Sequence, residues 1–158
     1  MKALRELEPL EDMEAQQDAE DKRLKQWTRV VGEDRARAAL ALRQAQRTRR
    51  TLPELLAERW LMDRGMRYRA QYPLIWARPD FVIWGAQVAG VLVWEIQGEY
   101  WHGASTSSAT GRDAARKEKL LQSVIEGMPV MAVVELWEKD IYQNESVFSL
   151  ALQGVSNR

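Results

Sequence analysis

The 158-residue sequence predicts an α/β protein in which a mixed central sheet is flanked by helices. Two nearly continuous apolar stretches, 78–84 and 90–97, are typical of strands buried in the centre of a sheet. Helical patterns lie before and after these strands, and the 46% hydrophobic content is enough for one real core. The first 50 residues have few large apolar side chains. We therefore expect a charged helical extension over 1–50 and one folded domain over 51–158.

The expected elements follow one another in the order α-β-β-β-α-β-α. The first helix begins at Thr51, has Glu54 at the capping-box position and stops at Gly65. The remaining elements are strands over 66–74, 78–84 and 90–97 with a turn from Gly85 to Gly90, a small-residue loop over 102–111, a helix over 113–127, a strand over 129–137 and a helix over 144–154 capped by Asn144.

The composition excludes several classes of protein. The chain has no cysteine, so disulfides and thiolate metal sites are excluded. No apolar run approaches the length of a membrane span, and no signal sequence opens the chain. We expect a cytoplasmic protein with no membrane partner.

The net charge of zero conceals an asymmetry between the two ends of the extension. Residues 1–21 hold eight acids and two bases, whereas residues 22–50 hold ten bases and two acids. A helical pattern over 34–50 puts Arg43, Arg47 and Arg50 on one face. This face is either solvated or a nucleic-acid contact, and the N-terminal helices are also candidates for a homodimer interface.

Two carboxylates interrupt the apolar central strands. Asp80 and Glu95 stand on adjoining predicted strands, and Gln97 shares a sheet face with Glu95 because side chains alternate. Two close carboxylates repel each other unless a cation compensates them, and Mg²⁺ needs only a few oxygen ligands, such as these two and the Ile96 carbonyl. The alternative is that Asp80 caps a turn after Pro79 and Glu95 pairs with an arginine.

The spacing of these residues resembles a known family. Pro79-Asp80 and Glu95-Ile96-Gln97 resemble the PD-(D/E)xK signature of the restriction-endonuclease-like superfamily. A closer resemblance, from Thr51 to about Leu152, is to very-short-patch-repair (Vsr-type) endonucleases and the related DUF559 domains. It rests on Thr51-x-x-Glu54, Gly65-Met66-Arg67-Tyr68-Arg69, Gln71, Arg78-Pro79-Asp80-Phe81-Val82, Gly98, Trp101-His102, Leu136-Trp137-Glu138 and Asn144-Glu145.

The resemblance implies a role for four residues. Asp80 takes the place of the central metal ligand, and Glu54 that of the acidic residue on the first helix. Glu95 corresponds to the second ligand of the broader superfamily. His102 falls where the patch-repair enzymes have a histidine that activates water; without the resemblance it reads as a packing or surface residue.

The sequence also departs from the family pattern. Gln97 stands where the signature usually has a lysine, and an amide cannot stabilise developing charge as an ammonium group does. Lys117 or Lys119 could reach in from the next helix. The zinc-binding cysteines and histidines of the patch-repair family are absent, so mismatch specificity does not transfer.

Together these features predict a metal-dependent DNA endonuclease that uses Mg²⁺, with Mn²⁺ as an alternative ion. The resemblance implies that Asp80, Glu95, Gln97, His102 and Glu54 form the site. Arginines can bind the phosphates, namely those of residues 29–50 with Arg67, Arg69 and Arg112. The competing interpretations are a binding or assembly module that kept the fold and lost catalysis, and a nuclease directed at RNA.

Overall fold

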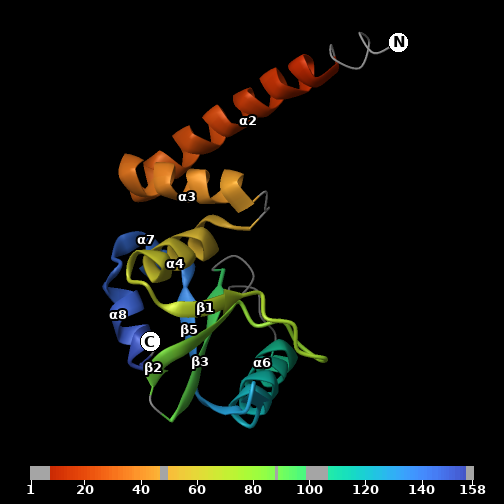
Figure 1. Cartoon of the computed structure of the whole chain (residues 1–158), viewed down its shortest axis with the longest axis vertical. Helices are drawn as coiled ribbons and strands as arrows, with labels where there is room; N and C mark the ends of the chain where they lie inside the picture. The colour runs from red at the N-terminus through yellow and green to blue at the C-terminus, as the bar shows by residue number, and fades with distance from the viewer. Residues whose placement is uncertain (1–7, 47–49, 88, 99–106, 156–158) are drawn as a thin grey trace. The chain divides into compact units, whose positions relative to one another are not determined.

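The computed structural model describes residues 8–46, 50–87, 89–98 and 107–155, and of the side chains those of 8–10 and 107–112 are not described. The chain divides into two compact units, Met1–Leu52 and Pro53–Arg158. The elements carry the same labels in Figure 1. Each unit is described by itself.

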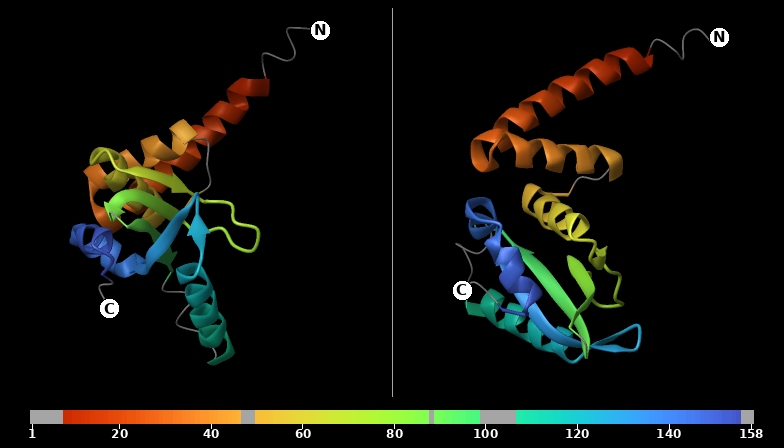
Figure 2. Two further views of the ribbon diagram at one scale, coloured as in Figure 1. Left: turned by 60° about the horizontal axis from the view of Figure 1, so that its bottom comes forward. Right: turned by 60° about the vertical axis from the view of Figure 1, so that its left-hand side comes forward.

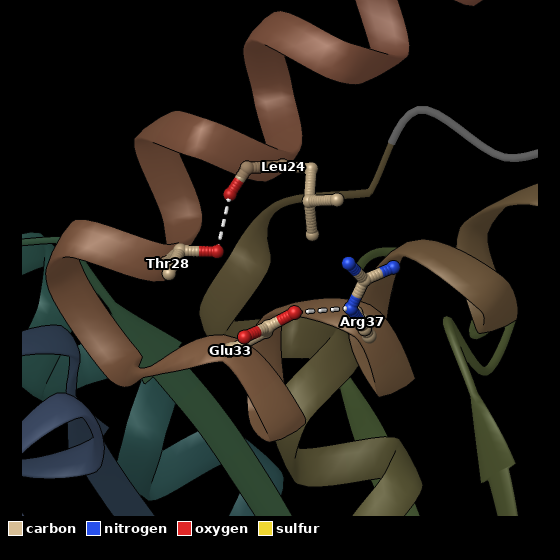
Figure 3. A network of polar contacts seen from close by, with 4 residues as sticks. All are labelled: Leu24, Thr28, Glu33 and Arg37. Atoms are coloured by element: carbon tan, nitrogen blue, oxygen red, sulfur yellow. Dashed lines mark hydrogen bonds and ion pairs between the residues drawn. The ribbon is translucent and has the colours of Figure 1, made fainter.

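The N-terminal unit contains the helices α2 (Glu8–Val31) and α3 (Glu33–Gln46), which pack against each other. Gly32 joins them with φ = 88°, a left-handed conformation that glycine adopts without strain. Glu33 opens α3, where its charge suits the positive end of the helix dipole, and its carboxylate lies 2.8 Å from the Nε of Arg37. Figure 3 shows this pair beside the Thr28 hydroxyl, which donates to the Leu24 carbonyl.

The C-terminal unit is built on a five-stranded sheet of order β1-β2-β3-β5-β4. The strands are β1 (Arg67–Ala70), β2 (Phe81–Gln87), β3 (Gly90–Gln97), β4 (Val124–Ile125) and β5 (Met128–Trp137). Pairing is antiparallel throughout except between β3 and β5, which are parallel. The helices are α4 (Leu52–Asp63), α6 (Ser107–Leu121), α7 (Glu138–Gln143) and α8 (Ser146–Leu152). The predicted mixed α/β fold is confirmed.

One face of the sheet packs against α4 and α8. Trp94 of β3 stacks on Phe148 of α8 at 5.9 Å between ring centroids, and Trp60 of α4 lies against both rings. The indole N–H of Trp94 donates to the carbonyl of Ala151, so this buried polar group is satisfied. Phe81 and Ile83 of β2 are fully buried and alternate with Val82, which points to the other face.

The opposite face of the sheet carries α6, as both views of Figure 2 indicate. Val82 and Trp84 of β2 form a core cluster with Val93 of β3 and Leu120 of α6. The helix therefore covers the face to which Val93 points. Because side chains alternate along a strand, Glu95 also faces the α6 side.

Several predicted boundaries are wrong. Part of the loop expected over 102–111 is helical, because α6 already begins at Ser107. Small residues can extend a helix toward its N-terminus when the later residues of that helix are packed. That helix ends at Leu121 instead of Gly127. Residues 124 and 125 form β4, and a two-residue turn with positive φ at Glu126 (50°) and Gly127 (78°) leads back into β5.

Three further predicted elements shift. The first strand spans four residues instead of 66–74, because the chain after Ala70 leaves the sheet. The expected turn from Gly85 is instead part of β2, which continues to Gln87 through an irregularity where Gly85 has φ = 83°. The helix expected over 34–50 ends at Gln46, so Arg50 does not share a helix face with Arg43.

The C-terminal helix is shorter than predicted. It covers Ser146–Leu152, and α7 precedes it directly after the last strand. The Asn144 side-chain oxygen accepts from the Ser146 N–H at 2.9 Å, a local turn that starts α8. No helix in the described part of the chain is both long and apolar enough to cross a membrane.

Candidate active site

The centre of the candidate site is an acidic pair, Asp80 and Glu95, where β2 begins and β3 ends. Phe81 pairs with Trp94 in the antiparallel register, so Asp80, one residue before β2, comes opposite Glu95. Their side chains contact each other on the sheet face that carries α6. The structure thus brings together the two carboxylates that the sequence singled out.

Asp80 is held by hydrogen bonds to both of its oxygens. The backbone N–H of Ile96 donates to Oδ2 at 2.7 Å, and the Gln71 side-chain amide donates to Oδ1 at 3.1 Å. The Gln71 backbone N–H also donates to the Asp80 carbonyl at 2.8 Å. Asp80 therefore has a fixed orientation across the end of two strands, and it does more than cap a turn after Pro79.

Glu95 is the more deeply buried partner, with 8% of its side chain exposed. Burial raises the pKa of the Glu95 carboxyl to about 8; the guanidinium of Arg116 opposes this shift and Asp80 adds to it. Its Oε1 is buried and lies 2.9 Å from the Nη1 of Arg116 in an ion pair. This oxygen is buried, and only an ion pair compensates its charge.

Arg116 of α6 is a site residue that the sequence reasoning did not find. The sequence pointed to Lys117 or Lys119 as the cation that reaches the site from this helix. The ammonium of Lys119 lies instead 4.4 Å from the Trp76 ring centroid. Arg116 precedes the buried Leu120 by four residues and hence shares its helix face. That spacing was the available signal. The arginine pairing that we considered as an alternative for Glu95 is therefore present.

Gln71 connects the acidic pair to the first helix. Its side-chain amide contacts Asp80 and also Glu54 of α4, at 3.4 Å from Oε2. Gln71 has φ = 52°, a conformation that non-glycine residues avoid unless their surroundings hold them in it. We had used Gln71 only as part of the family resemblance. Its strained backbone and two carboxylate contacts give it a positioning function.

The donor set fits a hard divalent cation. Asp80 and Glu95 offer carboxylate oxygens, and one of these, Glu95 Oε1, is buried beside the guanidinium of Arg116. The backbone N–H of Ile96 points toward Asp80. The N–H and the C=O of one strand residue point to the same side of the strand, so the Ile96 carbonyl also points to the Asp80 side. Within the described ranges, no three His, Cys, Asp or Glu side chains lie close enough to hold a metal. Mg²⁺, which keeps several waters, requires no more than this set.

The remaining candidate residues are placed as follows. Gln97 ends β3, half-buried and opposite Trp137 of β5. His102 and Arg47 lie outside the described residues, and Arg112 is placed in α6 by its backbone alone. Arg67 and Arg69 alternate with Tyr68 along β1, exposed on the sheet face opposite to that of Tyr68.

Of the three N-terminal arginines predicted to contact DNA, the two described ones differ in their surroundings. Arg43 is half-buried in the last turn of α3. Arg50 donates to the side chain of Gln46 at 3.2 Å.

The mixed sheet, whose central antiparallel hairpin ends in an acidic pair, defines a nuclease-like α/β protein. Residues 33–108 match the family model described as DNA mismatch endonuclease Vsr, a PD-(D/E)xK-like nuclease family. The match confirms the predicted resemblance to Vsr-type endonucleases up to residue 108 and includes Glu54, Asp80, Glu95 and His102. The resemblance predicted for residues 109–152, and that to DUF559 domains, lies outside the match. The match begins further toward the N-terminus than we expected. A search of the curated proteins and one of the solved structures each found no match.

Proposed function

We propose that the protein is a metal-dependent endonuclease that hydrolyses phosphodiester bonds of DNA. The observation that carries this proposal is the contact between two carboxylates, the half-buried Asp80 and the buried Glu95, at the ends of two paired strands. The pair lies in the segment that matches a DNA endonuclease family. Protein cores rarely keep two contacting carboxylates without a cation to compensate them.

Asp80, Glu95 and the Ile96 carbonyl would hold Mg²⁺ or Mn²⁺. The ion, when bound, polarises a phosphate oxygen and lowers the pKa of a coordinated water. Gln71 and the Ile96 N–H keep Asp80 in its orientation. Glu54 supports the site through the Gln71 amide, which contacts both Glu54 and Asp80.

His102, Gln97 and Arg116 complete the proposed machinery. His102 is the proposed base that takes the proton of the attacking water, since a neutral imidazole titrates near neutral pH. Gln97 orients water or the phosphate. Arg116 has 39% of its side chain exposed, so it can stabilise Glu95 with one nitrogen while other donors face a bound phosphate.

The DNA contacts proposed for this enzyme are basic side chains in both units. Arg43, Arg47 and Arg50 belong to the N-terminal unit, and Arg67, Arg69 and Arg112 to the C-terminal unit. Phosphate contacts of this kind give affinity that does not depend on sequence. A homodimer through the N-terminal helices and a cytoplasmic location belong to the same proposal.

A second candidate function is a binding or assembly module without catalysis. Two observations favour it: Arg116 already compensates Glu95, and a glutamine replaces the usual lysine at position 97. Against it stands the retained pair itself, because a buried carboxylate that serves no purpose costs stability.

Cleavage assays separate the two candidates. Supercoiled, linear, mismatched and branched DNA would be incubated with the protein in Mg²⁺, Mn²⁺ or EDTA. We expect cleavage of at least one DNA form in either metal, none in EDTA, and none with Asp80→Asn. Arg59→Ala is the matched control, since Arg59 pairs with Asp63 on the exposed side of α4. Binding without any cleavage would establish the binding module, and cleavage that persists in Asp80→Asn would exclude the site.

A further inference from the structure

The segment between β1 and β2 forms a narrow hairpin that projects from the sheet beside α6 (Figure 1, yellow-green). Backbone hydrogen bonds close it at three levels. Gln71 donates to Asp80 at 2.8 Å, Tyr72 to Pro79 at 3.1 Å, and Leu74 to Ala77 at 2.9 Å. Ile75 and Trp76 are therefore the two residues of the tip, and the candidate ligand Asp80 stands at the base.

The tip presents an apolar side chain to solvent from a rigid support. Ile75 is fully exposed, at 106%, and Trp76 is 37% exposed. Tyr72 and Leu74 pack against the core cluster below α6, so they fix the hairpin. Isolated exposed apolar residues are common on protein surfaces. A bare isoleucine next to a tryptophan at the end of a supported hairpin is a less common arrangement and fits an apolar contact with a partner.

The surroundings of the tip are basic. The ammonium of Lys119 lies 4.4 Å from the centroid of the Trp76 ring, and the guanidinium of Arg69 lies 5.2 Å from that of Tyr72. Arg78 is exposed on the returning strand of the hairpin. A partner that suits this surface offers apolar groups to the tip and negative charge to the basic side chains near it. Stacked bases between two phosphate backbones have this chemistry.

We propose that Ile75 and Trp76 form a wedge that inserts between bases of the DNA while Arg69, Arg78 and Lys119 contact the flanking phosphates. This inference rests on the proposed function, which supplies the DNA. Five residues separate Ile75 from Asp80, and an extended chain rises about 3.3 Å per residue, so the tip lies at most about 17 Å from the acidic pair. At 3.4 Å per base pair, the wedge contacts bases within about five pairs of the cleaved bond.

The test uses a short duplex that the protein binds, with 2-aminopurine placed at each base pair in turn, in EDTA. Unstacking raises the fluorescence of this base analogue, so wild-type protein is expected to raise the emission at one or two adjacent positions. Ile75→Ser should lose this rise and bind about 10-fold to 100-fold more weakly, the loss that corresponds to exposing an isoleucine. Its salt dependence should stay unchanged because no phosphate contact is removed.

Met62→Ser is the matched control, because Met62 is an exposed apolar residue of α4 at 44%. It should bind and unstack DNA as the wild type does. If Ile75→Ser and the wild type have the same DNA affinity and the same 2-aminopurine emission, the wedge is overturned. Cleavage of DNA in Mg²⁺ would then still support the endonuclease. A rise in emission without cleavage would support the wedge and contradict the endonuclease. Absence of DNA binding by the wild type would overturn both.

Discussion

The backbone N–H of Ile96 donates a 2.7 Å hydrogen bond to the Oδ2 of Asp80 and so joins the ends of β2 and β3. This bond fixes one carboxylate on the strand that carries the other, Glu95. The acidic pair is therefore a consequence of strand pairing. Such preorganisation is what a metal site of few protein ligands requires.

Asp80→Asn should abolish divalent-metal binding and leave the fold intact. The amide keeps the size of the side chain and can still accept from Ile96, but it removes the charge that attracts the cation. Calorimetric titration with Mn²⁺ should show one site in the wild type and none in the variant. Without metal and above pH 8, where Glu95 is ionised, the variant should unfold at a higher temperature, because the repulsion of Glu95 by Asp80 is removed. Unchanged Mn²⁺ binding would refute the ligand assignment.

The stability of the metal-free protein should fall as the pH rises from about 5 to 8. The pKa of Glu95 is about 8 in the folded chain and 4.5 as a model value, so the folded state binds more protons in this window. Ionisation of the buried carboxyl then removes stability as the pH passes through 8. Urea unfolding in EDTA at several pH values measures this dependence, which Glu95→Gln should flatten. In Arg116→Gln the fall in stability should continue to a higher pH, because the positive charge that lowers the pKa of Glu95 is gone.

The same proton equilibrium predicts how metal binding responds to pH. A cation binds the ionised form of Glu95, so its affinity should increase with pH up to about 8 and then level off. Titrations with Mg²⁺ at pH 6, 7 and 8 measure this. An affinity that does not change over this range would mean that Glu95 is no ligand.

The central strands and their acidic pair could be predicted from the sequence because apolar runs and alternation are local signals. Phe81 to Trp84 and Val91 to Trp94 are buried as expected. The contact of Asp80 with Glu95 followed from placing these two strands side by side. The register itself could not be predicted, because the turn pairs Gln87 with Gly90 and Phe81 meets Trp94 only after a shift between Ile83 and Gln87.

The rest depended on tertiary contacts. Two-residue β4 has too few residues for a pattern, and only its turn at Glu126 and Gly127 could have indicated it. Arg116 approaches Glu95 because Leu120 sets the rotation of α6, which periodicity alone gives only approximately. The positive φ of Gln71 depends on two carboxylates that are distant in sequence.

Replacing Arg43, Arg47 and Arg50 together by alanine should weaken binding to all DNA sequences alike. Each lost phosphate contact should reduce the slope of log affinity against log salt by roughly 0.9. Fluorescence anisotropy at several salt concentrations measures both quantities. Arg59→Ala is the control, because its guanidinium pairs with Asp63. An unchanged affinity and slope would leave these arginines as solvated or assembly residues.

His102→Ala should retain metal and DNA binding but reduce the cleavage rate by roughly 10²–10⁴, the usual contribution of a general base. His102 follows Glu95 by seven residues, past the end of β3, and it is the only histidine of the chain. Because only the neutral imidazole accepts a proton, wild-type cleavage should decline as the pH falls below the imidazole pKa. The variant should lack this decline. Its cleavage rate should depend on pH only through the binding of the metal to Glu95. Single-turnover rates at saturating Mn²⁺ between pH 5.5 and 8.5 separate the two. If the variant cleaves at the wild-type rate, a water bound to the metal is the base and His102 is a packing residue.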